Sequence, residues 1–139
     1  MFWNVQGAAS PNFLQTFRTL VKTYKPLMVA IFEPRINGIK ADEFIRKSGF
    51  DKSHKVEANG FSSGIWLLWK DSYDVEIISN RKKFIHFNIS KNNVFLSWIT
   101  VIYASPNSCK MRHLISPEQF FLYVVFGNFS SKSFFMLFA

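Results

Sequence analysis

A helix-spaced run of apolar residues that leads directly into a continuous apolar segment constrains the fold more than any other feature of this sequence. Between Phe13 and Tyr24 the apolar positions recur at the spacing of one buried helix face, and Pro26 ends the helix because the residue before a proline disfavours helical backbone. The next segment, residues 27–33, is apolar up to a final carboxylate, which is typical of a strand buried on both faces. Together they predict an α/β fold.

The other segments extend this order into strand, helix, strand, helix and then a meander of strands. A short aromatic strand is expected at residues 2–5, and a second helix at residues 40–50, which Gly49 ends. Runs of alternating or continuous apolar residues predict further strands at 54–58, 64–70, 75–79, 84–90 and 94–104.

The character of the sequence changes near Arg112. Residues 1–112 contain the alternating predicted strands and helices and are expected to form one domain. Residues 113–139 contain Phe120, Phe121, Phe126, Phe129, Phe134, Phe135 and Phe138 in a short space and offer one strand candidate, at 120–126. We expect this segment to be a divergent, Phe-rich tail, and a shift of reading frame after the Arg112 codon would explain it.

Charge and cysteine content limit the class of protein. The net charge is 17 − 9 = +8, which suits a polyanionic partner such as nucleic acid, although a basic protein without that role has the same balance. Cys109 is the single cysteine, so an internal disulfide is excluded. No secretory signal and no membrane-length apolar run is present. We therefore expect no membrane partner and an intracellular location, with the nucleus as one candidate compartment.

Polar side chains stand at the carboxyl ends of three predicted strands. Asn4 follows the first strand, Glu33 ends the buried strand, and Tyr103 ends the last long strand. Each residue alone has an ordinary explanation, as a turn residue, a solvated carboxylate or a packed aromatic. Ligands of α/β sheets collect beyond the carboxyl ends of strands. An amide, a carboxylate and a phenol around one cleft suit a hydrated divalent cation and a phosphate oxygen.

Four motifs in the same order carry a resemblance to a known family. WNVQG (3–7), FEPRI (32–36), SSGIWLLW (62–69) and VIYASPN (101–107) resemble the endonuclease/exonuclease/phosphatase superfamily, which is DNase-I-like. The similarity is closest to the apurinic-type endonuclease domain of plant LINE-type (non-LTR) retrotransposons. It covers Phe2 to about Arg112. The resemblance implies the N-terminal half of a four-layer α-β-β-α sandwich, truncated.

The resemblance also implies roles for individual residues. Asn4 would help to hold metal and phosphate, Glu33 would bind Mg²⁺, and Tyr103 would hydrogen-bond the scissile phosphate of DNA. Asn107 would face the DNA. Members of the family hydrolyse a phosphodiester with Mg²⁺ and a water activated by a histidine–aspartate pair. The implied cofactor is therefore Mg²⁺, and the implied partner is DNA.

The sequence departs from the family in its second half. The family's Gly-Asp-Phe-Asn motif has only a degenerate counterpart at 127–130, where Asn128 stands in place of the aspartate. The family's later aspartate and its Ser-Asp-His motif have no counterpart in this sequence. The histidines His54, His86 and His113 do not stand at the position that the order of the family's motifs gives to the catalytic histidine. The loss of one essential acid–base group commonly costs a factor of about 100 to 10,000. We expect a truncated, inactive fragment of a retrotransposon endonuclease.

Two other functions stay open. A non-catalytic nucleic-acid-binding remnant would use basic residues on phosphates, among them Lys22, Lys25, Arg81, Lys82 and Lys83. The run at 81–83 is more typical of a solvated hairpin edge than of a phosphate site. A phosphatase of the same superfamily would act on small phosphoesters, although the FEPRI and VIYASPN motifs favour the endonuclease.

The expected truncation also predicts an uncovered surface. If residues 1–112 supply the strands of roughly one sheet, its inner face would lack a covering layer. Large exposed apolar patches promote association. We therefore expect self-association or aggregation through a face that carries some of Ile65, Leu67, Ile77, Phe87, Leu96 and Ile99.

Overall fold

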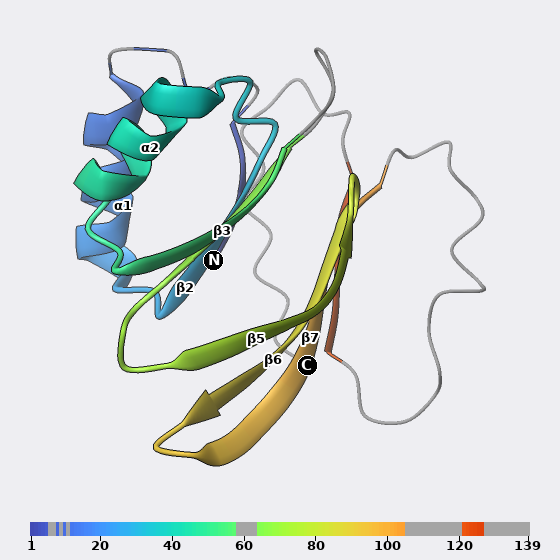
Figure 1. The fold of residues 1–139 in the computed structure, drawn as a ribbon. Helices are drawn as coiled ribbons and strands as arrows, with labels where there is room; N and C mark the ends of the chain where they lie inside the picture. The colour runs from blue at the N-terminus through green and yellow to red at the C-terminus, as the bar shows by residue number, and fades with distance from the viewer. Residues whose placement is uncertain (6–7, 9, 11, 58–63, 105–120, 127–139) are drawn as a thin grey trace.

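The computed structural model describes residues 1–5, 8, 10, 12–57, 64–104 and 121–126. Within them the chain forms two four-stranded sheets and two helices (Figure 1). Sheet A has the strand order β1-β2-β4-β3, and sheet B has the order β5-β6-β7-β8. The elements are, in chain order, β1 (Phe2–Asn4), α1 (Phe13–Tyr24), β2 (Met28–Phe32), α2 (Gly38–Lys47), β3 (Lys52–Val56), β4 (Ile65–Trp69), β5 (Asp74–Arg81), β6 (Phe84–Lys91), β7 (Val94–Ala104) and β8 (Phe121–Phe126).

The two helices have the ends that their sequences favour. α1 has the predicted bounds, and the N–H of its C-cap, Lys25, donates to the carbonyl of Val21 at 2.9 Å. α2 ends at Lys47, earlier than predicted, because Gly49 two residues later adopts a left-handed backbone with φ 86°. No helix in the described part of the chain is long and apolar enough to cross a membrane.

Sheet A is buried on both faces because its two central strands alternate between two apolar environments. In β4, Trp66 and Leu68 belong to the cluster that includes the helices, whereas Ile65, Leu67 and Trp69 belong to the cluster that faces sheet B. β2 is parallel to β1 and antiparallel to β4. Its side chains also alternate between the two apolar clusters. The continuous apolar runs of the sequence therefore correspond to two-sided burial.

Aromatic rings hold the helices on the outer face of sheet A. Phe17 of α1 is fully buried, and its ring centroid lies 5.9 Å from that of Trp3 in β1 and 5.2 Å from that of Phe44 in α2. Phe13 stacks on both Trp3 and Phe44 with centroids 4.9 Å apart. This cluster joins both helices to the first strand, so it positions Asn4 at the end of that strand.

Sheet B covers the other face of sheet A. β5, β6 and β7 form an antiparallel meander, and β8 runs parallel to β7. Figure 1 shows the resulting order of layers, with the helices outside sheet A and sheet B on its far side. The apolar residues between the sheets are Ala30, Phe32, Val56, Ile65, Leu67 and Trp69 from sheet A and Ile85, Phe87, Val101 and Tyr103 from sheet B.

The prediction of a single sheet with an uncovered inner face was wrong. Ile65, Leu67 and Phe87 are fully buried, because the strands from residue 74 onward pair with one another and form a second sheet. Ile77 and Ile99 are partly buried in the same cluster, whereas Leu96 is exposed. The predicted route to self-association therefore loses its basis. The predicted boundary near Arg112 lies outside the described residues.

The burial of Phe17 generates a stability prediction. Phe17→Ala should lower the free energy of unfolding by about 3–5 kcal/mol, because it opens a cavity inside the aromatic cluster. The matched control is Phe95→Ala, whose side chain is 53% exposed and which should cost less than about 1 kcal/mol. Urea unfolding followed by tryptophan fluorescence measures both variants. Similar losses in the two variants would contradict this account of the core.

A contact between the two sheets generates a pH prediction. Nε2 of His54 in β3 lies 2.9 Å from Nδ2 of Asn80 in β5, and partial burial lowers the pKa of His54 below its ordinary value. An amide N–H donates only to the neutral imidazole. Because the unfolded chain takes up the proton at higher pH than the folded chain, stability should fall as the pH drops below about 6.5.

Urea midpoints at pH 7.5 and 5 measure this effect for the unmodified chain and for His54→Gln. The variant should lose part of the pH dependence, and the change should be small because the imidazole keeps contact with solvent. An identical pH dependence in both proteins would assign the effect to other groups.

Candidate functional site

Asn4 and Glu33 leave neighbouring parallel strands at the same edge of sheet A. Asn4 is paired in register with Phe32, the residue before Glu33. The pairing continues past the strand ends, since the N–H of Val5 donates to the carbonyl of Phe32 at 3.1 Å and that of Ala8 donates to Pro34 at 2.6 Å. The chain therefore brings both side chains to one place, as the sequence predicted.

The backbone of Glu33 is held in an unusual conformation. Its φ is 52°, in the left-handed region, which costs a residue other than glycine on the order of 1–3 kcal/mol. The N–H of Glu33 donates to the carbonyl of Gly64 at 3.1 Å. A Cβ atom on Gly64 would lie 3.1 Å from the carbonyl oxygen of Val56 and 3.6 Å from Pro34, so this close approach favours glycine. Such strain is common where a side chain must be aimed at a ligand.

Tyr103 brings sheet B into the same site. It lies in β7, one residue before the end of the strand, and its phenol donates a hydrogen bond to Oε1 of Glu33. Its ring stacks on Phe32 with centroids 5.6 Å apart, and only 8% of the residue is exposed. The three predicted residues Asn4, Glu33 and Tyr103 therefore converge, and we name them the strand-end site.

The environment keeps the phenol of Tyr103 protonated. Burial raises its pKa above the ordinary value, and both the hydrogen bond to Glu33 and the charge of that carboxylate raise it further. Arg35 and Asn4 act in the opposite direction with smaller effect. The group is therefore a hydrogen-bond donor throughout the physiological pH range.

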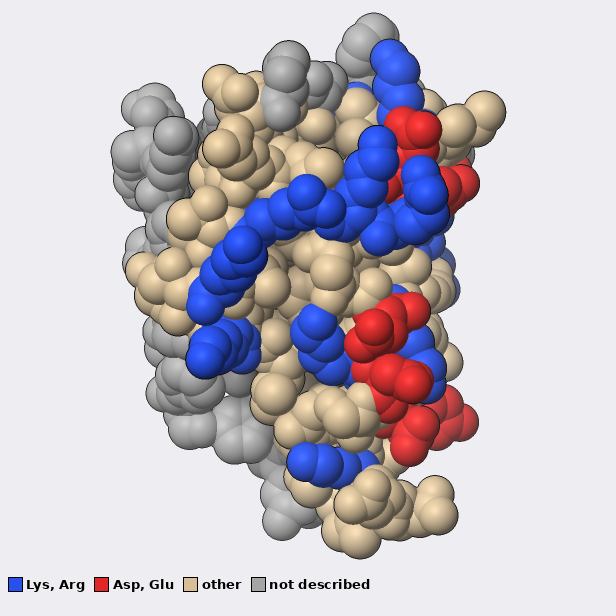
Figure 2. Space-filling view, turned by 90° about the vertical axis from the view of Figure 1, so that its left-hand side faces the viewer, with Lys and Arg blue, Asp and Glu red and all other residues tan. Residues whose placement is uncertain are grey.

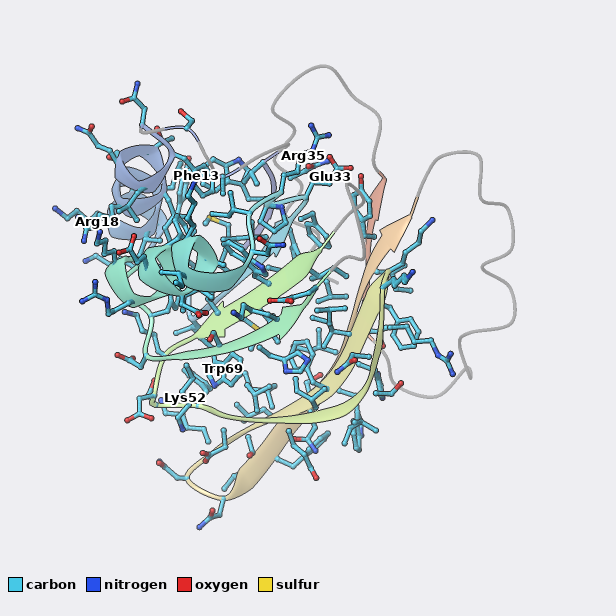
Figure 3. All side chains as sticks on the ribbon, turned by 45° about the horizontal axis from the view of Figure 1, so that its top comes forward. Phe13, Arg18, Glu33, Arg35, Lys52 and Trp69 are labelled. Carbon is cyan, nitrogen blue, oxygen red and sulfur yellow. The ribbon has the colours of Figure 1, made fainter. Side chains whose placement is uncertain are left out.

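Arg35 is a part of the site that the sequence reasoning missed. Its Nη2 lies 3.1 Å from Oε2 of Glu33, and Figure 3 shows the two side chains together at the edge of the sheets. Each carboxylate oxygen of Glu33 thus has a protein donor, Tyr103 on one and Arg35 on the other. The FEPRI motif contains this arginine, so the signal was present in the sequence.

The predicted basic residues Lys82 and Lys83 lie in the turn between β5 and β6. Both are exposed, and the carbonyl of Lys83 accepts the N–H of Tyr103 at 2.7 Å. The turn therefore borders the strand-end site.

The strand-end site offers oxygen ligands for a divalent cation. Oδ1 of Asn4 is buried and has no hydrogen-bond partner among the described residues, and the Glu33 carboxylate is close to it in the sheet. The described part of the chain has no group of three or more His, Cys, Asp or Glu side chains suited to a metal. Mg²⁺ often takes only one or two protein carboxylates and keeps several waters or phosphate oxygens. The residues therefore fit Mg²⁺.

Other candidate residues lie away from the strand-end site. His54 contacts Asn80, and His86 stacks on Trp98 with centroids 5.7 Å apart. His86 alternates with Ile85 and Phe87, which face sheet A, so it lies on the opposite face of sheet B. Asn107, Asn128 and His113 lie outside the described residues.

An apolar recess of about 380 Å³ lies at the other end of the sandwich. Its lining includes Phe2 and Met28 at the beginnings of β1 and β2, Lys25 at the end of α1, and Phe87 and Val101 of sheet B. None of the residues of the strand-end site lines it. Its lining carries no carboxylate, so this recess lacks the ligands that a Mg²⁺ site requires.

Comparisons with known proteins give partial structural likenesses, among them two nucleases. No family model and no curated protein matches the sequence. The endonuclease domain of TRAS1, a telomere-specific non-LTR retrotransposon, is similar with a TM-score of 0.49 and 12% identity, over 76% of this chain and 45% of that one. The AP endonuclease LMAP from Leishmania major has a TM-score of 0.46 and 17% identity, over 71% and 37%. The chain thus spans less than half the length of either nuclease.

The contact between Tyr103 and Glu33 generates a spectroscopic prediction. Ultraviolet titration of the folded chain should contain a tyrosine component with a midpoint above pH 10, and Tyr103→Phe should remove it, because burial and Glu33 both oppose ionisation. Tyr73→Phe is the matched control and should retain that component. If the high-pH component persists in Tyr103→Phe, the phenol is not held as described.

Proposed function

We propose that this chain is a partial phosphodiester hydrolase domain of the DNA endonuclease type, derived from a retrotransposon, that binds Mg²⁺ and DNA phosphate but does not complete hydrolysis by itself. The observation that carries the proposal is the convergence of Asn4, Glu33 and Tyr103 at one edge, in the order of the family motifs. DNA as the partner makes the nucleus the expected compartment.

Each residue of the site has a distinct task in this proposal. Glu33 and Asn4 hold the cation through a carboxylate and an amide oxygen. The bound metal would offset negative charge that develops on the phosphodiester. Tyr103, which stays protonated, would donate its O–H to a phosphate oxygen in place of Glu33. Lys82 and Lys83 attract the DNA backbone to this edge, and Asn107 is proposed to contact the DNA beyond it.

The proposed inactivity rests on the lack of a histidine at the strand-end site among the residues that the structure describes. Hydrolysis requires a base that takes a proton from the attacking water, and neither His54 nor His86 lies at the strand-end site. The degenerate motif that includes Asn128 replaces the expected aspartate by an amide, which accepts no proton at neutral pH. Truncation of the domain would remove the remaining acid–base groups.

A second function is favoured by the charge of the chain. A non-catalytic nucleic-acid-binding remnant would need the basic surface alone and no cation at Glu33. The net charge of +8 and the exposed Lys82–Lys83 turn favour it. The two proposals differ in whether Glu33 and Mg²⁺ contribute to binding.

The effect of Mg²⁺ on DNA binding distinguishes the domain with a metal site from the remnant without one. Fluorescence anisotropy of a labelled DNA duplex is measured at constant ionic strength with Mg²⁺ or with chelator, for the unmodified chain, Glu33→Gln and the control Glu76→Gln. Mg²⁺ should tighten binding by roughly tenfold in the unmodified chain and in the control, because a cation held by Glu33 would offset the negative charge of the phosphate. Glu33→Gln should lose this gain. Binding that is equally tight with chelator would favour the remnant without a metal site.

Nicking of supercoiled plasmid tests the proposed inactivity separately. The purified, folded chain should produce no nicks above background with Mg²⁺. Nicking by the unmodified chain that disappears in Glu33→Gln would overturn the inactivity and would support the metal site. Nicking that persists in Glu33→Gln would indicate a contaminating nuclease.

A further inference from the structure

Five cations gather on the outer side of the helices, away from the strand-end site. Arg18, Lys22 and the C-cap residue Lys25 belong to α1 and its end, and Arg46 and Lys47 close α2. All five are exposed. We name them the helical basic face. Figure 2, which looks onto the helix-covered side of the molecule, shows lysine and arginine side chains in a continuous row across this surface.

These cations lack the acidic partners that other cations of the chain have. Lys52 pairs with Asp71 at 3.0 Å and Lys55 with Asp42 at 2.5 Å. In the part of the chain that the structure describes, none of the five forms an ion pair.

The sequence explains this imbalance of charge. Residues 1–32 contain no aspartate or glutamate, so Glu33 is the first acidic residue of the chain. The acidic residues of α2, Asp42 and Glu43, precede its basic end by one turn. The positive potential of the helical basic face is therefore only weakly compensated.

The helices hold the cations in fixed relative positions. Arg18 and Lys22 are four residues apart, so they lie one above the other on the same face of α1. Nε of Arg18 donates to the carbonyl of Lys47 at 2.9 Å, which ties the end of α2 to α1. The aromatic cluster around Phe17 fixes both helices on sheet A. The backbone positions of the cations are therefore fixed relative to one another before DNA binds.

Between Arg18 and Lys22 the exposed surface of α1 is polar, whereas Tyr24 and Leu27 beside Lys25 are exposed apolar side chains. Thr19 and Thr23 of α1 are exposed, and their hydroxyls donate to backbone carbonyls one turn earlier. The apolar stripe of α1, which includes Phe13 and Phe17, is buried on sheet A. Helices that bind a membrane surface need an apolar face that is free to insert into lipid. This combination favours a polyanion with regularly spaced charges over a membrane.

We propose that the helical basic face is a second nucleic-acid-binding surface, which contacts the sugar-phosphate backbone of duplex DNA without reading its sequence. Figure 3 shows Arg18 on the outer side of α1, well apart from Glu33 and Arg35. This surface goes beyond the proposed function, because it requires neither Mg²⁺ nor Glu33. It would keep the chain on DNA whether or not the strand-end site is occupied.

A pair of charge-matched variants tests this surface. The helical variant removes three charges from the helical basic face and leaves the Arg18 contact intact; it carries Lys22→Gln, Arg46→Gln and Lys47→Gln. The control variant removes three charges that already pair with carboxylates or lie over the ring of Tyr73; it carries Lys52→Gln, Lys55→Gln and Lys91→Gln. Anisotropy with a DNA duplex is measured in chelator over a range of salt concentrations, and circular dichroism verifies the fold of both.

The helical variant should bind roughly tenfold more weakly, and the slope of log K against log salt should decrease by about three units, since each phosphate contact contributes about 0.9. The control variant should change affinity by less than about twofold. Equal losses in the two variants would overturn the proposal, because net charge alone would then explain the binding.

Two further measurements distinguish a membrane partner from DNA and the helical basic face from the strand-end site. Binding to vesicles of anionic phospholipid that the helical variant abolishes, with no binding to DNA, would overturn the proposal in favour of a membrane partner. Glu33→Gln measured in chelator should bind DNA like the unmodified chain. Unchanged binding of the helical variant in chelator, together with a Mg²⁺-dependent gain that Glu33→Gln removes, would overturn the second surface and leave the proposed function standing.

Discussion

The burial of β2 and β4 on both faces is the constraint on which the rest of the structure depends. A strand in that position must alternate between two apolar layers, so the helices and sheet B are both required to cover it. Trp66 and Leu68 face the helices, and Ile65 and Leu67 face sheet B. Once these layers are in place, the ends of β1, β2 and β7 lie at one edge. The site is a consequence of the packing.

The contact between Tyr103 and Glu33 links that packing to the chemistry. It joins the end of sheet A to the end of sheet B, and it also occupies one oxygen of the carboxylate that is proposed to hold the cation. Arg35 occupies the other oxygen. A cation at Glu33 would therefore compete with these donors for the lone pairs of the carboxylate, and the exposed arginine is the easier one to move because water replaces its partner. Tyr103 would keep its place against Phe32, and its single O–H would be free for a phosphate only once it no longer donates to Glu33.

The sequence predicted local structure and strand-end residues better than it predicted the arrangement of sheets. The bounds of α1 follow from a clear 3.6-residue period and a proline. Asn4, Glu33 and Tyr103 were singled out because they stand at the carboxyl ends of predicted strands, where ligands of α/β sheets collect, and because they match motifs of the resemblance. The division into two sheets was missed because the turn after Trp69 is short and carries no distinctive signal. Pairing between strands depends on contacts distant in the sequence, which periodicity does not encode. Arg35 was missed for a related reason, since its side-chain direction depends on a left-handed backbone at Glu33 and at Arg35 itself.

Electrostatics divide the molecule into two kinds of surface. At the strand-end site a single carboxylate is surrounded by donors, so its charge is balanced locally and a cation competes with those donors. On the helices the charges have no such balance, because the first 32 residues hold no acid and the acids of α2 lie one turn away. A polyanion gains from releasing counterions only where cations are uncompensated. The helical basic face meets that condition, and the strand-end site meets it only through the neighbouring turn at Lys82 and Lys83. Affinity for nucleic acid and chemistry on a phosphodiester would therefore reside on different parts of the chain, and the first could persist after the second is lost.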